Sequence, residues 1–389
     1  MNLKNKILIF KKLKKFCLIA TPRSGSDYFQ SLIDGHSQAL TFNGSLCLYT
    51  EIFKKIDFKN KNKKNIKRAI NIFIRKYHNK LNTKFDKEEG KGQLGILKNE
   101  YINIDINYFK KILLKNLFIE NFNKKNFCLG VYFSYNFIIN KDFKNKKILL
   151  LHPHNLDELK EFHNDFKEAC YIFTVRDFRA AYLSELYNFV KFNQKKFFTF
   201  KHHYVALYRL FNCTDYAKKY NLKHIIIKLE NLPKKNVLTK IAKFFGIRFE
   251  KSLLHSTFAG KKWNGDNKQV VEYKDKWSSN RTYNGWKYKL SLNDISILNL
   301  VLRKKIKFYK HQYIKTSFLF NFSILIRIFF PMKFEHELFH YYIKVACSKK
   351  KFKYLNFFYD LSFYFRRIFL VFKFLFLSFF FKTTKVKVF

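Results

Sequence analysis

The chain has 389 residues, enough to bury a large core without disulfides or metals, in one large or two ordinary domains. Its 77 Lys and Arg against 28 Asp and Glu give a formal net charge of +49, and 20% of its residues are aromatic. Only 11 Gly and 4 Pro exclude a collagen-like or proline-rich protein, and 48% hydrophobic residues exclude a chain that is disordered throughout. Because Lys, Asn, Ile and Phe are enriched over the whole chain, the charge favours anionic partners in general and indicates no specific nucleic acid.

The cysteine pattern and the N-terminus both bear on the cellular compartment. The six cysteines are isolated, without the paired spacing of a zinc site or a disulfide framework, which predicts a reducing compartment. The basic N-terminus has an apolar run over 7–10 only, too short for the core of a signal peptide. We therefore expect a cytoplasmic protein, or one bound to the cytosolic face of a membrane.

The first chemical motif follows the apolar run of residues 16–20. The segment 21–26, Thr-Pro-Arg-Ser-Gly-Ser, precedes apolar residues at helical spacing, which predicts a strand, a tight turn and a helix ending near Gly35. Successive N–H groups and the helix dipole make such a turn a nest for a phosphate-like anion, although a plain strand–helix turn remains an alternative. It is not a Walker A loop, because Ala20 stands where glycine is needed and no lysine precedes the serine.

Residues 54–68 hold eight Lys or Arg and a single acid, Asp57. A run of this kind is typical of a solvated helix face or loop. We expect no specific role for it.

Residues 147–312 alternate strand and helix patterns. Strands are predicted at 148–151, 171–175 and 224–229, with helices between them, which indicates βαβ units and a parallel sheet. We expect a P-loop-like α/β fold, a three-layer sandwich with a central parallel sheet. Ligands bind beyond the carboxyl ends of such strands, so the segments after residues 20, 151 and 175 should converge.

The second motif lies after the strand 171–175. Arg176 ends this strand and Ser184 follows eight residues later on the next predicted helix. A guanidinium and a hydroxyl that meet in space can hold a second phosphate, although a surface ion pair is an alternative role for the arginine.

The two motifs, in this order and spacing, resemble the sulfotransferase family that uses 3′-phosphoadenosine 5′-phosphosulfate (PAPS). The resemblance covers about residues 14–312, with an insert at about 54–125, and the opening stretch is similar to bacterial carbohydrate sulfotransferases. It implies transfer of a sulfuryl group from PAPS to a hydroxyl of a carbohydrate or glycolipid acceptor. The implied cofactor-binding residues are Arg23, Ser24, Gly25 and Ser26 for the phosphosulfate, Arg176 and Ser184 for the 3′-phosphate, and Lys261, Lys262 and Trp263 in a closing loop.

The sequence also departs from the family pattern. Phe178 replaces the usual proline after Arg-Asp, and Ser45 stands where several carbohydrate sulfotransferases carry glutamate. Asp27 would repel phosphosulfate if its side chain pointed into the turn.

Sulfuryl transfer needs a base for the acceptor hydroxyl and stabilisation of the transferred group. Three residues are candidate bases by resemblance, with His152 first, Glu51 close behind and His154 third. Arg23 is the candidate for stabilising charge during transfer. The transferred group carries less negative charge than a phosphoryl group, so we expect no metal.

The last segment, 315–389, is basic and holds 20 of the 50 phenylalanines. Its run over 368–381 contains one lysine and is shorter than the roughly 20 apolar residues of a spanning helix. We expect a helical extension that either packs on the core or binds an anionic membrane surface.

Two other functions remain as alternatives. A P-loop-type kinase or nucleotide-binding protein would need the missing Walker lysine and a magnesium carboxylate. A basic membrane-associated adaptor without catalysis would use the 315–389 segment alone.

Overall fold

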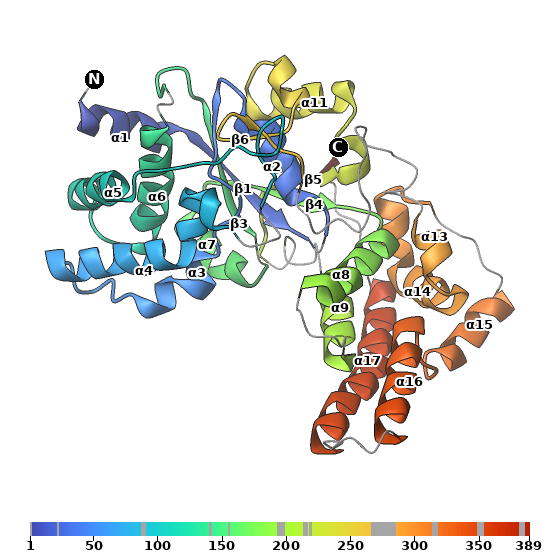
Figure 1. Ribbon diagram of the computed structural model, residues 1–389. Coiled ribbons are helices and arrows are strands. Elements are labelled where there is room, and N and C mark those ends of the chain that lie inside the picture. The colour runs from blue at the N-terminus through green and yellow to red at the C-terminus, as the bar shows by residue number, and fades with distance from the viewer. Residues whose placement is uncertain are drawn as a thin grey trace.

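The computed structural model shows a twisted sheet covered by helices, with a group of helices packed beside it (Figure 1). The residues that the structure describes are 2–21, 23–86, 91–139, 142–154, 156–192, 199–212, 217, 220–265, 285–312, 318–347, 354–380 and 386–389.

The central sheet has six strands in the order β2-β3-β1-β4-β5-β8, and every neighbouring pair is parallel. The chain winds from β1 toward β2 on one side and from β4 toward β5 on the other, so the winding changes direction between β1 and β4. This is where open α/β sheets place their ligands. The strands are β1 Lys14–Ala20, β2 Ala39–Leu40, β3 Ile148–His154, β4 Cys170–Val175, β5 His224–Lys228 and β8 Lys387–Val388.

Both faces of the sheet are buried, because alternate residues of each strand enter two different hydrophobic clusters. Phe16 and Leu18 of β1 face the helices α2 and α11, whereas Cys17 and Ile19 face α6 to α8. The predicted three-layer sandwich with a central parallel sheet is confirmed. The helices of these layers are α2 Ser26–Asp34, α6 Lys124–Ile138, α7 Leu159–Asp165, α8 Phe178–Phe192 and α11 Lys235–Phe245.

Further helices extend the layer on the α6 side. The helix α4 packs on α5, and α5 packs on α6. The side chains of Asn62, Asp105 and Asn123 accept hydrogen bonds from N–H groups of the first turns, which explains where α4, α5 and α6 begin. The additional helices are α1 Leu3–Lys12, α3 Leu48–Glu51, α4 Lys63–Leu81 and α5 Ile106–Glu120.

The helices after β4 and the C-terminal helices together form a helical lobe beside the sheet (Figure 1). Within it, α17 packs on α9 and α14, and α8 packs on α9 and α14. Helices from before and after residues 312–315 thus pack in the same lobe, and the predicted domain boundary at these residues stays a prediction. The lobe contains α8 and also α9 Phe200–Asn212, α13 Trp286–Lys289, α14 Leu292–Phe308, α15 Phe318–Arg327, α16 Lys333–Cys347 and α17 Tyr354–Phe380.

Among the described residues of 315–389, helices dominate as predicted, except at the end of the segment. Residues 387–388 form β8, and Phe389 exchanges backbone hydrogen bonds of 2.9 Å with Lys228 and Ile226 of β5. Among the helices of the described chain, α17 included, none combines the length and the apolar content that crossing a bilayer requires.

Candidate active site

The turn between β1 and α2 has the backbone geometry of a tight anion-binding loop. Gly25 has φ +78°, and a Cβ built on it would lie 2.4 Å from Cδ1 of Leu229, so both conformation and space require glycine there. Arg23 also adopts a positive φ of 50°, while Pro22 lies outside the described residues. The N–H groups at the start of α2 therefore open toward the carboxyl edge of the sheet.

Hydroxyl groups connect this turn to β4. The Ser24 hydroxyl donates to the Thr21 carbonyl at 2.8 Å and lies 2.7 Å from the Thr174 hydroxyl, and Thr21 Oγ1 donates to the Thr174 carbonyl at 2.6 Å. These buried contacts compete with the predicted role of the Ser24 hydroxyl, which is to donate a hydrogen bond to the phosphosulfate. Its backbone N–H, and Ser26 at the first position of α2, are the remaining candidates on this side of the turn.

The two sequence motifs meet in the structure. Parallel register pairs Ala20 with Thr174, which places the ends of β1 and β4 side by side. Arg23 Nε donates to Ser184 Oγ at 3.2 Å across 161 residues of chain. Arg176, half-buried, directly follows β4 at the same edge.

The turn after β4 is held without the proline that the family pattern has. Arg179 is fully buried and donates to both Asp177 carboxylate oxygens, at 2.9 and 2.6 Å, and its guanidinium lies 3.9 Å from the ring centre of Trp286. Burial opposes ionisation of Asp177, but Arg179 outweighs it and lowers the pKa of this carboxyl. Phe178 packs on Tyr309, so it anchors the turn to the helical lobe.

His152 and His154, at the end of β3, form a hydrogen-bonded chain with Gln30 of α2. The Gln30 amide nitrogen donates to the carbonyls of Phe42 at 2.6 Å and Gly44 at 3.3 Å, so its oxygen must accept from His152 Nδ1 at 2.6 Å. His152 Nε2 then has a free lone pair, and His154 Nδ1 lies 3.4 Å from it. If His154 donates through Nδ1, its Nε2 is left as the basic nitrogen.

Burial separates the roles of the two histidines. His152 is completely buried, which lowers its pKa to about 3, and the Asp27 carboxylate opposes this only in part. His154 is half-buried and has φ +65°, a conformation that is uncommon for a residue other than glycine. His154 is therefore the member of the pair that solvent reaches.

Asp27 points toward these histidines, with Oδ1 3.8 Å from His152 Nδ1. Burial favours its neutral form, but electrostatic interactions with neighbouring basic groups outweigh this and lower the pKa of Asp27. Those groups are His152, His154, Lys80 and Arg23.

One ligand atom each from Asp27, His152 and His154 lies within 4.8 Å of the others, a spacing that could hold a metal ion. Two cations, Arg23 and Lys80, act on the same carboxylate and oppose a further cation there. The ligand atoms thus suit a metal ion, whereas the neighbouring positive charges oppose one, and we assign no metal to this cluster.

Glu51 lies apart from the histidine pair in its contacts. Its carboxylate accepts from Tyr77 Oη at 3.0 Å and pairs with Lys76 Nζ at 3.2 Å, both on α4. Its side chain is 37% exposed, so it remains accessible at the end of α3.

The predicted closing loop begins at the opposite end of α2 from the turn. Lys261 and Lys262 form β7, which pairs with β6, Thr257–Phe258, and the Gly260 N–H donates to the Asp34 carboxylate at 3.1 Å. Lys261 pairs with Glu100 at 2.7 Å, and Trp263 Nε1 donates to Gln93 at 3.2 Å. The side-chain hydrogen bonds of Lys261 and Trp263 are therefore with residues 93–100, and the role of this loop in closing over the cofactor stays a prediction. The loop after residue 265 lies outside the described residues.

Two further residues near the histidine pair could not be identified from the sequence as part of the site. Lys80 belongs to α4, and its Nζ lies 2.9 Å from where a Gly44 Cβ would stand. Gln30 appeared only as a polar residue in α2. Both act through contacts between segments far apart in the chain, so no local motif marks them.

The fold and this edge define a P-loop-like α/β protein with a turn suited to an anion and a histidine pair beside it. A family model described as "Sulfotransferase family" matches residues 16–251, which is more than half of the chain. The chain belongs to the sulfotransferase family.

Two solved sulfotransferase structures are similar to this chain at low identity and low TM-score. The sulfotransferase domain of the Synechococcus PCC 7002 olefin synthase is 14% identical, with 64% of this chain and 80% of that chain covered and a TM-score of 0.35. The sulfotransferase STF9 from Mycobacterium avium is 9% identical, with 79% and 80% covered and a TM-score of 0.40. No curated protein matches the chain.

Proposed function

We propose that this sulfotransferase uses PAPS as the donor and transfers its sulfuryl group to a hydroxyl of a carbohydrate or glycolipid acceptor. The observation that carries the proposal is the Arg23–Ser184 hydrogen bond, which joins the two phosphate motifs at the carboxyl edge of β1 and β4. Arg23, Gly25 and Ser26 would hold the phosphosulfate, with the Ser24 N–H beside them. Arg176 and Ser184 would hold the 3′-phosphate.

The histidine chain supports His154 as the base in this proposal, with His152 and Gln30 as positioning residues. His154 Nε2 would take the proton of the acceptor hydroxyl as the oxygen forms its bond to sulfur. The bond between sulfur and the 5′-phosphate oxygen breaks, and its electron pair leaves on adenosine 3′,5′-bisphosphate. Arg23 offsets the negative charge on the transferring oxygens. Glu51 remains the alternative base.

Calorimetry with adenosine 3′,5′-bisphosphate in the absence of magnesium tests the donor assignment. We expect binding that Arg176→Ala weakens, whereas a P-loop kinase would require magnesium and a nucleoside triphosphate. Absence of binding, or binding that the variant leaves unchanged, contradicts the proposal. A screen with labelled PAPS over glycans and glycolipids would then identify the acceptor.

The proposal includes docking on an anionic membrane surface, on the cytosolic face, through residues 315–389. The outward side of α17 is apolar: Phe365, Phe369 and Phe376 are 53%, 74% and 63% exposed. Arg366 and Lys373 are exposed along the same helix. An exposed aromatic face with interspersed cations suits the interface of an anionic bilayer.

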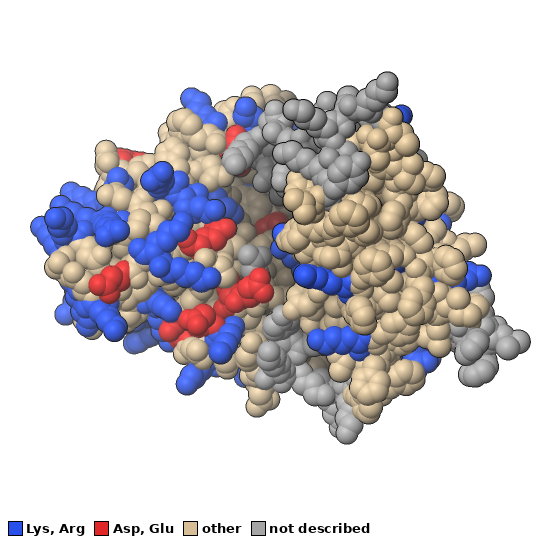
Figure 2. Space-filling model, turned by 90° about the horizontal axis from the view of Figure 1, so that it is seen from below, with Lys and Arg blue, Asp and Glu red and all other residues tan. Residues whose placement is uncertain are grey.

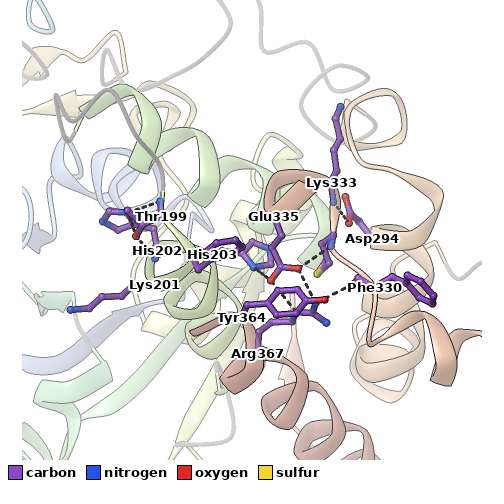
Figure 3. A network of polar contacts seen from close by, with 12 residues as sticks. Thr199, Lys201, His202, His203, Asp294, Phe330, Lys333, Glu335, Tyr364 and Arg367 are labelled. Carbon is purple, nitrogen blue, oxygen red and sulfur yellow. Dashed lines mark hydrogen bonds and ion pairs between the residues drawn. The ribbon is translucent and has the colours of Figure 1, made fainter. Parts of the chain in front are cut away.

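A buried polar network fixes which side of α17 faces outward (Figure 3). Arg367 donates to Glu335 of α16 at 3.0 and 2.8 Å, and Glu335 lies 3.0 Å from His203 of α9. About two turns earlier on α17, Asp360 accepts from the N–H groups of Phe200 and Lys201 at the start of α9. Since these contacts set the rotation of α17, the Phe residues are exposed as a consequence of the fold.

Vesicle flotation with the full chain tests the docking. Phe369→Ser/Phe376→Ser should lose most binding to vesicles that contain phosphatidylserine, because burial of each ring in the interface is lost. The matched control is Phe85→Ser/Phe118→Ser, which changes rings that are 64% and 51% exposed elsewhere. Equal flotation of both variants contradicts membrane docking, and concentration-dependent dimerisation lost in the first variant alone would assign the face to a second copy.

A further inference from the structure

A second charged region lies along α4, outside the candidate active site. Two adjacent cavities, of about 320 and 380 Å³, open on the solvent side of this helix and share Arg68 in their walls. Figure 2 shows Lys and Arg gathered on the end of the molecule where α4 lies, while the opposite end is largely uncharged. The cationic residues that line the cavities are Lys54, Lys55, Lys64, Lys67, Arg68 and Arg75.

These six cations lack acidic partners in the part of the chain that the structure describes. All six are exposed, and none forms an ion pair there, whereas Lys76 on the same helix pairs with Glu51. The one acid in the cavity walls, Asp57, accepts from the Lys59 N–H at 2.9 Å. Uncompensated positive charge repels itself, so an anionic ligand would stabilise this surface.

The helix also connects this surface to the candidate active site. Lys64, Arg68, Asn71 and Arg75 follow one another at spacings of three and four residues, which places them along one side of α4. At the C-terminal end of the helix, Lys80 acts on the charges of Asp27 and His152. The row from Lys64 to Arg75 spans 11 residues, or about 17 Å along the helix axis, and non-helical backbone angles at Tyr77 (φ −113°, ψ 22°) kink α4 before Lys80.

We propose that α4 binds the acidic chain of the acceptor, a polysaccharide that carries negative charges at regular intervals, and guides its hydroxyl to the sulfuryl-transfer site. This inference rests on the proposed function, and it narrows the acceptor to an anionic carbohydrate. A flexible polyanion fits a row of exposed cations better than a neutral sugar, which would find few hydrogen-bond acceptors among lysine and arginine side chains.

Fluorescence anisotropy with labelled dextran sulfate, with unsulfated dextran alongside, measures this binding without donor. The test variant is Lys64→Gln/Arg68→Gln/Arg75→Gln. The control Lys240→Gln/Lys243→Gln/Lys251→Gln removes the same charge from exposed positions of α11 and the segment after it. The test variant should bind dextran sulfate about tenfold or more weakly at low salt, because it loses three contacts that are each worth up to about fivefold. The control should bind less than about twofold more weakly.

Equal losses in both variants would show that net charge alone binds the polymer and would overturn the inference. Tighter binding of RNA or of anionic vesicles than of dextran sulfate through the same three residues would overturn it as well. Binding of adenosine 3′,5′-bisphosphate is measured on the same samples. If the wild type fails to bind this nucleotide, the proposed function fails, whatever the result with dextran sulfate.

Discussion

The sheet region and the helical lobe distribute polar and apolar groups in opposite ways. Around the sheet, both faces are filled with aliphatic and aromatic residues, and polar groups such as Arg23 and His154 gather at the carboxyl edge of the strands. In the lobe, Arg367 and Glu335 are fully buried, while Phe369 and Phe376 lie on the surface. Polar groups at the sheet edge thus remain available to a ligand, whereas those in the lobe are used to orient its helices.

The largest effect should come from the histidine at the sheet edge. We expect His154→Ala to lower kcat about 100- to 10,000-fold, the range for loss of a general base, with little change in the melting temperature. His152→Ala should lower it less, because that residue acts through His154. A larger loss in Glu51→Gln would assign the base to Glu51 instead.

The pH–rate profile separates the two histidines further. His152 has a pKa of about 3 because it is buried. If it were the base, the reaction rate would therefore stay unchanged as the pH falls, until the pH reaches that value. The fall near pH 6.5 that an unperturbed histidine gives would therefore exclude His152 as the base.

Breaking the lobe's network should affect stability more than activity. Arg367→Leu leaves Glu335 buried without its two hydrogen bonds from the arginine, and we expect a loss of about 3–5 kcal/mol in the free energy of unfolding. Urea denaturation measures it. Lys76→Gln breaks an exposed pair with Glu51 and should cost less than about 1 kcal/mol. Similar values for the two variants would contradict the distinction between the regions.

Glu158 is an exception in the sheet region, because its carboxyl is fully buried although it lies only four residues after the end of β3. Burial raises its pKa to about 7, although the Thr50 N–H and hydroxyl donate to it. The folded state therefore keeps the proton while the unfolded state loses it, so stability is full below about pH 4.5 and declines as pH rises to 7. Glu158→Gln should remove this decline, which is up to about 3 kcal/mol, and identical pH profiles of stability would contradict the assignment.

The smallest effect concerns the junction of the two regions. Arg176→Ala should weaken adenosine 3′,5′-bisphosphate binding by about 1.5–3 kcal/mol, the value of a hydrogen bond to a charged group. The control is Arg209→Ala, which removes an exposed arginine that pairs with the buried Glu185 on the lobe. Equal affinities for the two variants would remove Arg176 from the site.

The sequence predicted what depends on short stretches of chain. Buried runs predicted the strands at 148–151, 171–175 and 224–229 within a few residues of β3, β4 and β5. Parallel pairing then predicted that the segments after residues 20, 151 and 175 would converge, and Arg23 and Ser184 of two of these segments are in contact. Lys80 and Gln30 could not be found in this way, because their role depends on helix packing against a distant strand. The burial of His152 behind His154 likewise depends on neighbouring segments and gave no local signal.

Local sequence patterns also could not predict which phenylalanines of α17 are exposed. The phenylalanines alternate around the helix, so composition alone does not say which of them face solvent. That choice is made by Arg367 and Asp360, whose partners lie on α9 and α16.

The short strand β8 protects an edge of the sheet. Without it, β5, which reads His-Ile-Ile-Ile-Lys, would present a row of unpaired backbone groups beside a β-branched apolar segment. Such an edge is a template for another chain, and proteins commonly cover it to avoid aggregation. The pairing of β8 with β5 and the hydrogen bonds of Phe389 therefore protect this sheet edge from pairing with a second copy of the chain.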